Sequence, residues 1–354
     1  MNLREAMQPD RWCGMGHESS TGLNPARVGA IRSRPTASNS STWVVVLAGG
    51  QGTRLQQFVR LVLGSDRPKQ FCRIVGTRSM LRHTWDRAKQ LVPSNRIVTV
   101  ITAGQERYLE EEARVGRIPG SVLVQPANKE TAPGLFLPLL WIASRDPDAT
   151  AVVFPSDHFI WEETRFFLHV RAAVALAAQH ADRLILLGVE PDNPEQGYGW
   201  IVPAARLRDG VRCEAYEVQR FLEKPDRPIA MRLYAQGCFW NTLVLAGRMQ
   251  TYLRLAESAA PEVLTPLFDL AERLGPPLDR MELAHVYRRF PPTDLSRTLL
   301  TRCSEDLVLL AVREVHWSDW GDPERILRTL RRVNRRPGWL PVYARIVEAG
   351  GISS

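Results

Sequence analysis

The sequence lacks the cysteine pattern of a disulfide-stabilised or zinc-binding protein. Its five cysteines are odd in number and include no C-x-x-C pair, which argues against a disulfide framework and against a structural zinc site. No apolar run approaches the length of a membrane span, and the N-terminus has no apolar signal core. We therefore expect a protein with no membrane partner, located in the reducing cytoplasm.

The sequence also lacks a concentrated basic patch. Lys and Arg number 46 against 38 Asp and Glu, a formal net charge of +8, but the basic residues are scattered apart from short pairs. Nucleic-acid binding is therefore not expected, and a small, phosphate-rich substrate explains the excess better. With 354 residues, 44% of them hydrophobic, the chain is a globular protein larger than one ordinary core.

The stretch from Trp43 to Phe71 organises the rest of the chain. Residues 44–47 are apolar and mostly β-branched, which predicts a buried parallel strand, and the glycine-rich run Gly49–Arg54 follows them. A helix is predicted from about Leu55. A strand, a glycine loop and a helix N-terminus place several backbone N–H groups around one point, which favours the binding of phosphate.

The glycine loop matches neither of two familiar phosphate-binding motifs. A P-loop requires G-x-x-x-x-G-K-[ST], and a dinucleotide fingerprint requires a third glycine where Leu55 stands. Instead, the Pro-Lys-Gln run that carries Lys69 follows fifteen residues after Arg54, so that two cations can close on a polyphosphate. The alternative is an ordinary glycine turn with solvated Arg and Lys side chains.

Strands and helices alternate along the first half of the chain. Strands are predicted at 44–47, 96–102, 121–125, 151–154 and 184–189, and helices from 55 and at 80–91, 105–115, 134–145 and 166–180. This spacing predicts an α/β fold with a doubly wound, mostly parallel sheet, whose ligands sit at the carboxyl ends of the strands. Gly49–Arg54, Gln125–Pro133 and Ser156–His158 fall at such ends, so we expect them to share one crevice. Thr131 is predicted to cap the helix at 134–145, and Pro138 to kink that helix or delay its start.

The pattern changes in the second half of the chain. Strands are predicted at 197–202, 214–222 and 238–245, followed by a mostly helical stretch at 249–300. Strand character returns at 307–312 and 314–317, and a closing helix is predicted at 323–332.

The glycine loop and the Pro68–Phe71 run closely resemble the signature of the sugar-phosphate nucleotidyltransferases. The sequence Pro-Lys-Gln-Phe is most similar to the corresponding motif of the mannose-1-phosphate guanylyltransferase branch of that family. Further segments resemble family motifs and follow in the family's order: Lys129–Pro133, Gly197–Trp200, Phe221–Pro225, Phe239–Thr242 and Trp317–Gly321. The resemblance covers residues 43 to about 330.

This resemblance implies a Rossmann-like nucleotidyltransferase fold with a smaller sugar-binding lobe. It implies a nucleotide-binding part (43–195) and a sugar-binding and metal-closing part (196–335), followed by a C-terminal tail (336–354). Residues 1–42 mix Arg, Ser, Thr, Asn, Gly and Pro without a sustained period, which predicts a poorly ordered leader. The implied reaction is nucleotidyl transfer from a nucleoside triphosphate, with GTP favoured, to a sugar 1-phosphate, with mannose 1-phosphate favoured, releasing pyrophosphate. A homodimer is left open.

The resemblance also assigns roles to residues of this chain. The implied catalytic residues are Arg54, Lys69, Asp157 and Lys224. Nucleotide binding is implied for Leu47, Ala48, Gly49, Gly50, Gly52, Thr53, Gln125, Thr131 and Ala132. Sugar binding is implied for Gly199, Glu223 and Asn241. The implied cofactor is Mg²⁺, held by Asp157 and Asp319.

Three departures from the family pattern affect these assignments. Glu130 stands where the family has Asn, and Leu243 where it has Gly. The mannose branch's acidic segment is reduced to Thr293–Arg297, which makes Asp294 a competing metal ligand. Two alternatives therefore stay open: a thymidylyl or uridylyl transferase acting on another sugar 1-phosphate, and a regulatory paralogue that binds nucleotide without turnover.

Overall fold

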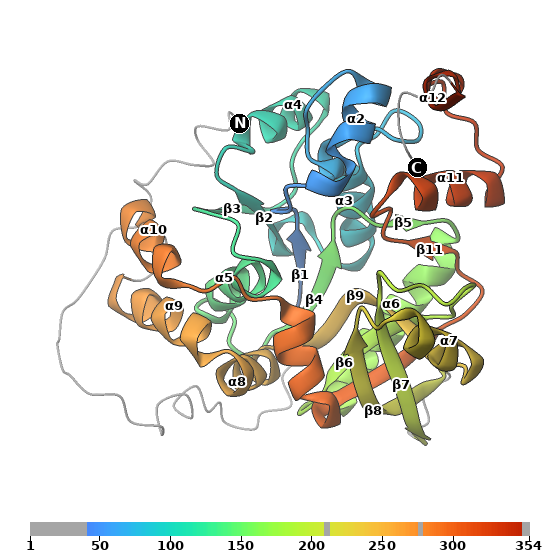
Figure 1. Ribbon diagram of the computed structural model, residues 1–354. Coiled ribbons are helices and arrows are strands. Elements are labelled where there is room, and N and C mark those ends of the chain that lie inside the picture. The colour runs from blue at the N-terminus through green and yellow to red at the C-terminus, as the bar shows by residue number, and fades with distance from the viewer. Residues whose placement is uncertain (1–40, 209–212, 275–278, 349–354) are drawn as a thin grey trace.

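The computed structural model describes residues 41–208, 213–274 and 279–348. Within these ranges a nine-stranded sheet, in the order β3-β2-β1-β4-β9-β6-β10-β8-β7, runs through the centre of the molecule. Helices cover both of its faces (Figure 1). The predicted leader falls outside the described residues except for its last two positions, and so does Cys13.

The N-terminal part of the sheet is parallel. It contains β1 (Thr42–Leu47), β2 (Ile97–Thr102), β3 (Ser121–Gln125) and β4 (Thr150–Pro155). Strand β1 pairs with β2 on one side and with β4 on the other, so that Val44 lies opposite both Ile97 and Val152. Every residue of β2 and β4 is buried, which explains why these strands read as largely apolar runs.

The remaining strands of the large sheet are β6 (Leu184–Val189), β7 (Gly199–Arg206), β8 (Ala215–Glu223), β9 (Phe239–Arg248) and β10 (Leu307–Val312). Strand pairing shows that seven of the nine strands run in one direction and that only β8 and β9 oppose it. The predicted α/β fold with a mostly parallel sheet is thus confirmed. Strand β9, from the part of the sequence interpreted as sugar-binding, lies between β4 and β6, so the two halves of the chain share one sheet.

Alternate residues of the strands point into two separate apolar layers. Val45 belongs to the layer covered by α5 (Thr131–Ala143), α8 (Met249–Ala259), α9 (Pro261–Leu274) and α10 (Arg280–Arg289). Val44 and Val46 belong to the layer covered by α3 (Met80–Leu91), α4 (Glu106–Val115), α6 (Glu163–Gln179) and α7 (Arg227–Ala235). The sheet therefore separates two cores, as in a doubly wound fold.

A third apolar cluster lies beside the glycine loop. It joins α2 (Gln56–Leu63), α11 (Pro323–Arg332) and α12 (Leu340–Glu348), which lie together in Figure 1. Trp339, just before α12, stacks edge-on with Phe58 of α2 at 5.3 Å between ring centroids, and its indole N–H donates to the Ile74 carbonyl at 2.8 Å. The segment predicted only as a tail thus contains a helix that packs on the helix following the loop.

One local prediction was wrong, and one of the two alternatives for Pro138, the delayed start, is excluded. Thr131 is the first residue of α5 and not its cap, because Glu130 holds the capping position and the Thr131 hydroxyl accepts the Leu295 N–H at 2.9 Å. Pro138 neither delays the start of α5 nor ends it, since the helix continues through it to Ala143.

Two further observations concern the whole of the described chain. Cys72, Cys238 and Cys303 are free thiols. Among the described residues, none of the helices is both long and apolar enough to span a membrane.

Candidate active site

Neighbouring side chains bind the carbonyl groups of the glycine loop. Gln70 Nε2 donates to the carbonyls of Ala48 at 2.6 Å and Gly50 at 2.8 Å, and Gln105 Nε2 donates to Gly50 at 2.9 Å. The N–H groups of Gly49–Gly52 donate to no other group in the described part of the chain. They are available to an anion, as a phosphate loop requires. Sequence reasoning missed Gln105, although it had noted Gln70 as part of the Pro-Lys-Gln run.

Two glycines of this loop are required by their surroundings. A Cβ on Gly49 would collide with Gln125 Nε2 and lie 3.0 Å from Thr102 Oγ1. Gly52 has φ 64°, and a Cβ there would lie 3.1 Å from Lys69 N. A residue with a side chain would therefore be strained at Gly52 and crowded at both positions. The loop packs closely against β2, β3 and the turn that carries Lys69.

Lys69 connects three segments that lie far apart in the sequence. Its side chain is buried, and Nζ forms an ion pair with Asp157 Oδ2 at 2.9 Å. The same ammonium donates to the backbone carbonyls of Asp319 and Trp320, the latter at 3.3 Å. Asp157 and Asp319, both with predicted metal-binding roles, thus contact the same lysine, whose backbone lies next to Gly52 of the glycine loop.

A small second sheet brings the two acidic segments together. Strand β5 (Phe159–Ile160) follows Asp157, and β11 (Trp317–Ser318) precedes Asp319. The two strands pair antiparallel, with Ser318 opposite Phe159. The predicted strand at 314–317 is therefore shorter and shifted, but it delivers Asp319 to the position that the sequence had suggested.

The Asp319 carboxylate is fixed by two groups. Arg325 Nη1 binds its two oxygens at 2.9 and 3.0 Å, and the Gly321 N–H donates to Oδ1 at 2.8 Å. Burial by itself would raise the pKa of Asp319, but the positive charges of Lys69 and Arg325 outweigh it, so the pKa is lowered. Asp319 is thus a partly buried, ionised acid whose orientation is set by its neighbours.

His158 is a neighbour that sequence reasoning did not single out, although it directly follows Asp157. Its Nε2 lies 3.7 Å from Asp157 Oδ1, and its ring stacks edge-on against Trp317 at 5.1 Å. Burial lowers the pKa of His158 more than the nearby acids raise it, so the imidazole is neutral near pH 7. It packs against the acids without adding a positive charge.

The two acids suit a divalent cation that brings other ligands with it. The described residues contain no group of three or more His, Cys, Asp or Glu side chains arranged to hold a metal. Mg²⁺, however, is commonly bound by one or two carboxylates together with phosphate oxygens and water. Asp157 and Asp319 could supply these two carboxylates. The described residues do not supply a metal site made of protein ligands alone.

The predicted sugar-binding residues form a second cluster at the ends of β7, β8 and β9. A Cβ on Gly199 would lie 2.7 Å from Glu223 Oε2 and 3.4 Å from Asn241 Cβ, which places the three residues in contact. Lys224 pairs with Glu223 at 3.3 Å, and its backbone N–H donates to the Tyr198 carbonyl at 3.1 Å. A carboxylate, an amide and an ammonium that converge in this way can bind hydroxyl and phosphate groups.

Asp294 acts electrostatically on Glu223 of the sugar cluster. Its charge, after burial and after the opposing effect of Lys224, helps to raise the pKa of Glu223. Its Oδ1 accepts the Arg297 N–H at 2.9 Å. The charges that act on the Asp319 carboxyl are instead those of Lys69 and Arg325.

The two departures at Glu130 and Leu243 share a backbone feature. Both have positive φ, 68° and 54° respectively, the left-handed region that β-carbon-bearing residues disfavour. The Leu243 N–H donates to Asn241 Oδ1 at 3.0 Å, so this backbone conformation orients a predicted sugar ligand. Leu243 thus keeps the conformation that a glycine would adopt more easily.

The segment next to the glycine loop on the β3 side offers one unsatisfied acceptor. Gln125 is buried, its Nε2 donates to Thr102 Oγ1 at 2.8 Å, and its Oε1 has no partner among the described residues. Oε1 faces the first turn of α5, where a Cβ on Gly134 would lie 3.3 Å away. The Ala132 N–H is already used, since it donates to the Thr293 carbonyl at 3.0 Å.

The remaining residues with predicted nucleotide-binding or catalytic roles differ in their contacts. The Leu47 carbonyl accepts the Ser156 N–H at 3.1 Å, which ties β1 to the Asp157 segment. Thr53 and Arg54 are exposed at the start of the helical turn, and Arg54 has no ion pair with the residues the structure describes. Lys224 likewise pairs with Glu223 and not with the Lys69 cluster.

Comparison with known proteins gives the following matches. A family model described as nucleotidyl transferase matches residues 43–335. The xanthan biosynthesis protein XanB of Xanthomonas campestris pv. campestris is 33% identical over 220 residues, which cover 62% of this chain and 44% of that protein. Mannose-1-phosphate guanylyltransferase of Klebsiella pneumoniae is 29% identical over 283 residues, 78% of this chain and 57% of that protein.

Among solved structures, one described as mannose-1-phosphate geranyltransferase from Thermus thermophilus has a TM-score of 0.69 and 25% sequence identity. The match covers 84% of this chain and 80% of that chain. The chain spans about half the length of the curated relatives named above.

Proposed function

The chain belongs to the nucleotidyl transferase family, and from that premise we propose that it transfers a nucleotidyl group from a nucleoside triphosphate to a sugar 1-phosphate. The observation that carries this proposal is the meeting of the glycine loop, Asp157 and Asp319 at Lys69. GTP and mannose 1-phosphate are the favoured pair, because curated relatives are named mannose-1-phosphate guanylyltransferases. The separate cluster around Glu223 and Asn241, with its carboxylate and amide groups, supports a sugar as the part of the acceptor substrate that carries the phosphate.

The reaction requires little proton chemistry. An oxygen of the sugar phosphate forms a bond to the α-phosphorus of the triphosphate, and the bond from that phosphorus to the bridging oxygen breaks. Pyrophosphate leaves with the electron pair. A phosphate monoester has a second pKa of about 6 and is largely dianionic at neutral pH, so the nucleophile needs no general base. Catalysis is then positioning and charge stabilisation.

The chain's own residues divide that task. The free N–H groups of Gly49–Gly52 and the Arg54 guanidinium would bind the triphosphate, and the buried Lys69 ammonium would neutralise charge on it as pyrophosphate departs. Lys224, beside the sugar cluster, would hold the incoming phosphate. Gln125 Oε1 would accept an N–H from the base, which would satisfy its missing hydrogen bond.

We include Mg²⁺ as the cofactor in this proposal. Asp157 and Asp319 would hold it together with phosphate oxygens and water. The bound cation would supply positive charge to the phosphate oxygens of the transition state. A cytoplasmic location and a homodimer complete the proposal.

A pyrophosphate-release assay over a matrix of nucleoside triphosphates and sugar 1-phosphates tests the function. We expect the fastest turnover with GTP and mannose 1-phosphate. A dominant rate with dTTP or UTP would reject the guanylyl assignment and keep the mechanism. Binding of GTP without turnover of any pair would reject the enzyme and support the regulatory alternative, for which the strained Glu130 beside α5 is the specific observation.

A further inference from the structure

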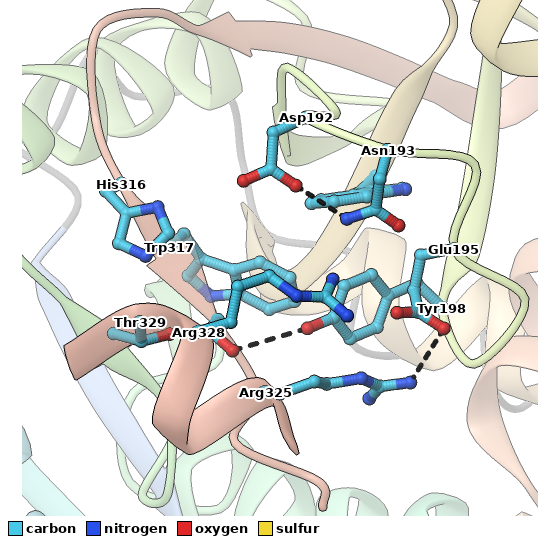
Figure 2. Close-up of a pocket in the computed structure, with 11 residues that line it drawn as sticks. Asp192, Asn193, Glu195, Tyr198, His316, Trp317, Arg325, Arg328 and Thr329 are labelled. Carbon is cyan, nitrogen blue, oxygen red and sulfur yellow. Dashed lines mark hydrogen bonds and ion pairs between the residues drawn. The ribbon is translucent and has the colours of Figure 1, made fainter. Parts of the chain in front are cut away.

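Arg325 of α11 connects the acidic segment with the loop before β7. Its side chain is only 11% exposed. One guanidinium nitrogen binds both oxygens of Asp319, another binds Glu195 Oε1 at 3.0 Å, and Nε lies 3.0 Å from Asp322 Oδ2. Figure 2 shows the guanidinium reaching across to Glu195 beneath the Tyr198 ring.

The loop before β7 is shaped around this guanidinium. Arg325 lies 4.3 Å from the centroid of the Tyr198 ring, the geometry of a cation–π contact. A Cβ on Gly197 would collide with Arg325 Nη2, so a glycine stands there to admit the arginine. Glu195 in turn accepts the Gly197 N–H at 3.0 Å. A continuous set of contacts therefore runs from Asp319 through Arg325 and Glu195 to Gly197, two residues from the sugar-side Gly199.

We propose that Arg325 is a positioning residue that fixes the Asp319 carboxylate and aligns it with the sugar-binding loop 195–199. This inference rests on the proposed function. Without the guanidinium, the Asp319 carboxylate would keep only the Gly321 N–H and the charge of Lys69, and its rotation would no longer be restricted by the contacts of both its oxygens with Arg325 Nη1. The loop would lose the group around which it closes.

Loss of an outer residue that orients a metal-binding group typically costs about 10–100-fold in metal affinity or activity. We therefore expect Arg325→Gln to weaken Mn²⁺ binding, measured by electron paramagnetic resonance on the full chain, by about 10–100-fold. At saturating Mg²⁺ it should also raise the KM for the sugar 1-phosphate more than the KM for the triphosphate. Arg325→Lys, which keeps the charge but has no second nitrogen to bind Glu195 at the same time, should recover part of the Mn²⁺ affinity.

The matched control is Arg328→Gln, one turn further along α11. Arg328 lines the same hollow in Figure 2 but is 43% exposed and pairs only with Glu324 within its own helix. It should retain wild-type Mn²⁺ binding and kinetics. Glu195→Gln is the second test, because it weakens the link to Gly197 while leaving the Arg325–Asp319 pair, and it should raise the sugar 1-phosphate KM with Mn²⁺ binding unchanged.

Thermal unfolding and near-UV circular dichroism show whether each variant is folded. If Arg325→Gln does not fold, Arg325→Lys and Glu195→Gln decide the question. Wild-type Mn²⁺ affinity and wild-type KM values in a folded Arg325 variant would overturn the proposal, and so would equal effects in Arg328→Gln. If the wild-type protein turns over no substrate pair, the proposed function fails, yet a selective loss of Mn²⁺ affinity in the Arg325 variants would still support the positioning role.

Discussion

The ammonium of Lys69 lies 2.9 Å from the Asp157 carboxylate and also binds the backbone carbonyl of Asp319. Two aspartates brought close together repel each other unless a positive charge lies between them. The lysine already supplies a positive charge at that place, so repulsion alone does not require the metal. The negative charge of the substrate phosphates is the stronger reason to expect Mg²⁺ at this site.

The first prediction concerns which acids serve the metal. Asp157→Asn and Asp319→Asn should each lower Mg²⁺-dependent turnover by more than about 100-fold, because even outer residues of metal sites cost about 10–100-fold. Asp294→Asn should change the KM for sugar 1-phosphate instead, since Asp294 acts on Glu223. Rates measured against Mg²⁺ concentration for the three variants separate these effects.

One of these variants should also be less stable. Asp319→Asn removes a charge partner of the largely buried Arg325, so it should lower the free energy of unfolding by about 1–3 kcal/mol. Urea unfolding followed by circular dichroism measures this. An Asp319→Asn protein with normal activity and metal dependence, beside an inactive Asp294→Asn protein, would show that Asp294 is the true metal ligand.

The second prediction separates the two lysines. Lys224→Ala should raise the KM for sugar 1-phosphate by about 10–100-fold, the effect of losing a hydrogen bond to a charged group, with the KM for triphosphate nearly unchanged. Lys69→Ala should show the reverse preference, because Lys69 lies behind the glycine loop. Steady-state kinetics with each substrate varied in turn is the measurement. Equal weakening of both substrates by Lys224→Ala would make Lys224 structural.

The third prediction concerns pH and Glu223. Burial, followed by the charge of Asp294, raises the pKa of Glu223 in the folded protein above its ordinary value. A raised carboxyl pKa means that stability is highest below the unfolded pKa and falls as pH rises through the folded one. Glu223→Gln cannot ionise, so it should be more stable than the wild type at pH 7 and no more stable at pH 4.

Urea unfolding of both proteins at pH 4 and pH 7 tests this difference in stability. Steady-state kinetics test the role of Glu223 in sugar binding. Glu223→Gln should raise the KM for sugar 1-phosphate by about tenfold, because a carboxylate accepts hydrogen bonds from hydroxyl groups more strongly than an amide. A stability difference that is the same at pH 4 and pH 7 would contradict the assignment of the raised pKa to this residue.

The fourth prediction compares two glycines. Gly197→Ala places a methyl group against Arg325 and should destabilise the protein by about 1–3 kcal/mol, the usual cost of overpacking. Gly50→Ala meets nothing within 4 Å and should change stability by less than about 0.5 kcal/mol. Thermal unfolding of both variants gives the comparison. Equal stability of the two would mean that Arg325 moves aside at little cost.

The sequence by itself determined the fold class and the outline of the site. Buried strands alternating with helices can be recognised from local periodicity, so most elements were predicted within a few residues, and α3, β3 and α11 match their predicted bounds. The glycine loop and Asp157 follow from the same reasoning, because parallel strands bring their carboxyl ends to one edge. Asp319 was implied only by the family resemblance, and the separate antiparallel pair of β5 and β11 brings it to Lys69.

Only the tertiary structure decided how these parts meet. The place of β9 at the centre of the sheet, the bridging position of Lys69 and the role of Arg325 all depend on contacts between residues more than a hundred positions apart or on side-chain direction. Local periodicity does not encode such contacts. The Thr131 cap failed for the same reason, since its hydroxyl is used by Leu295, which reaches it only through the fold.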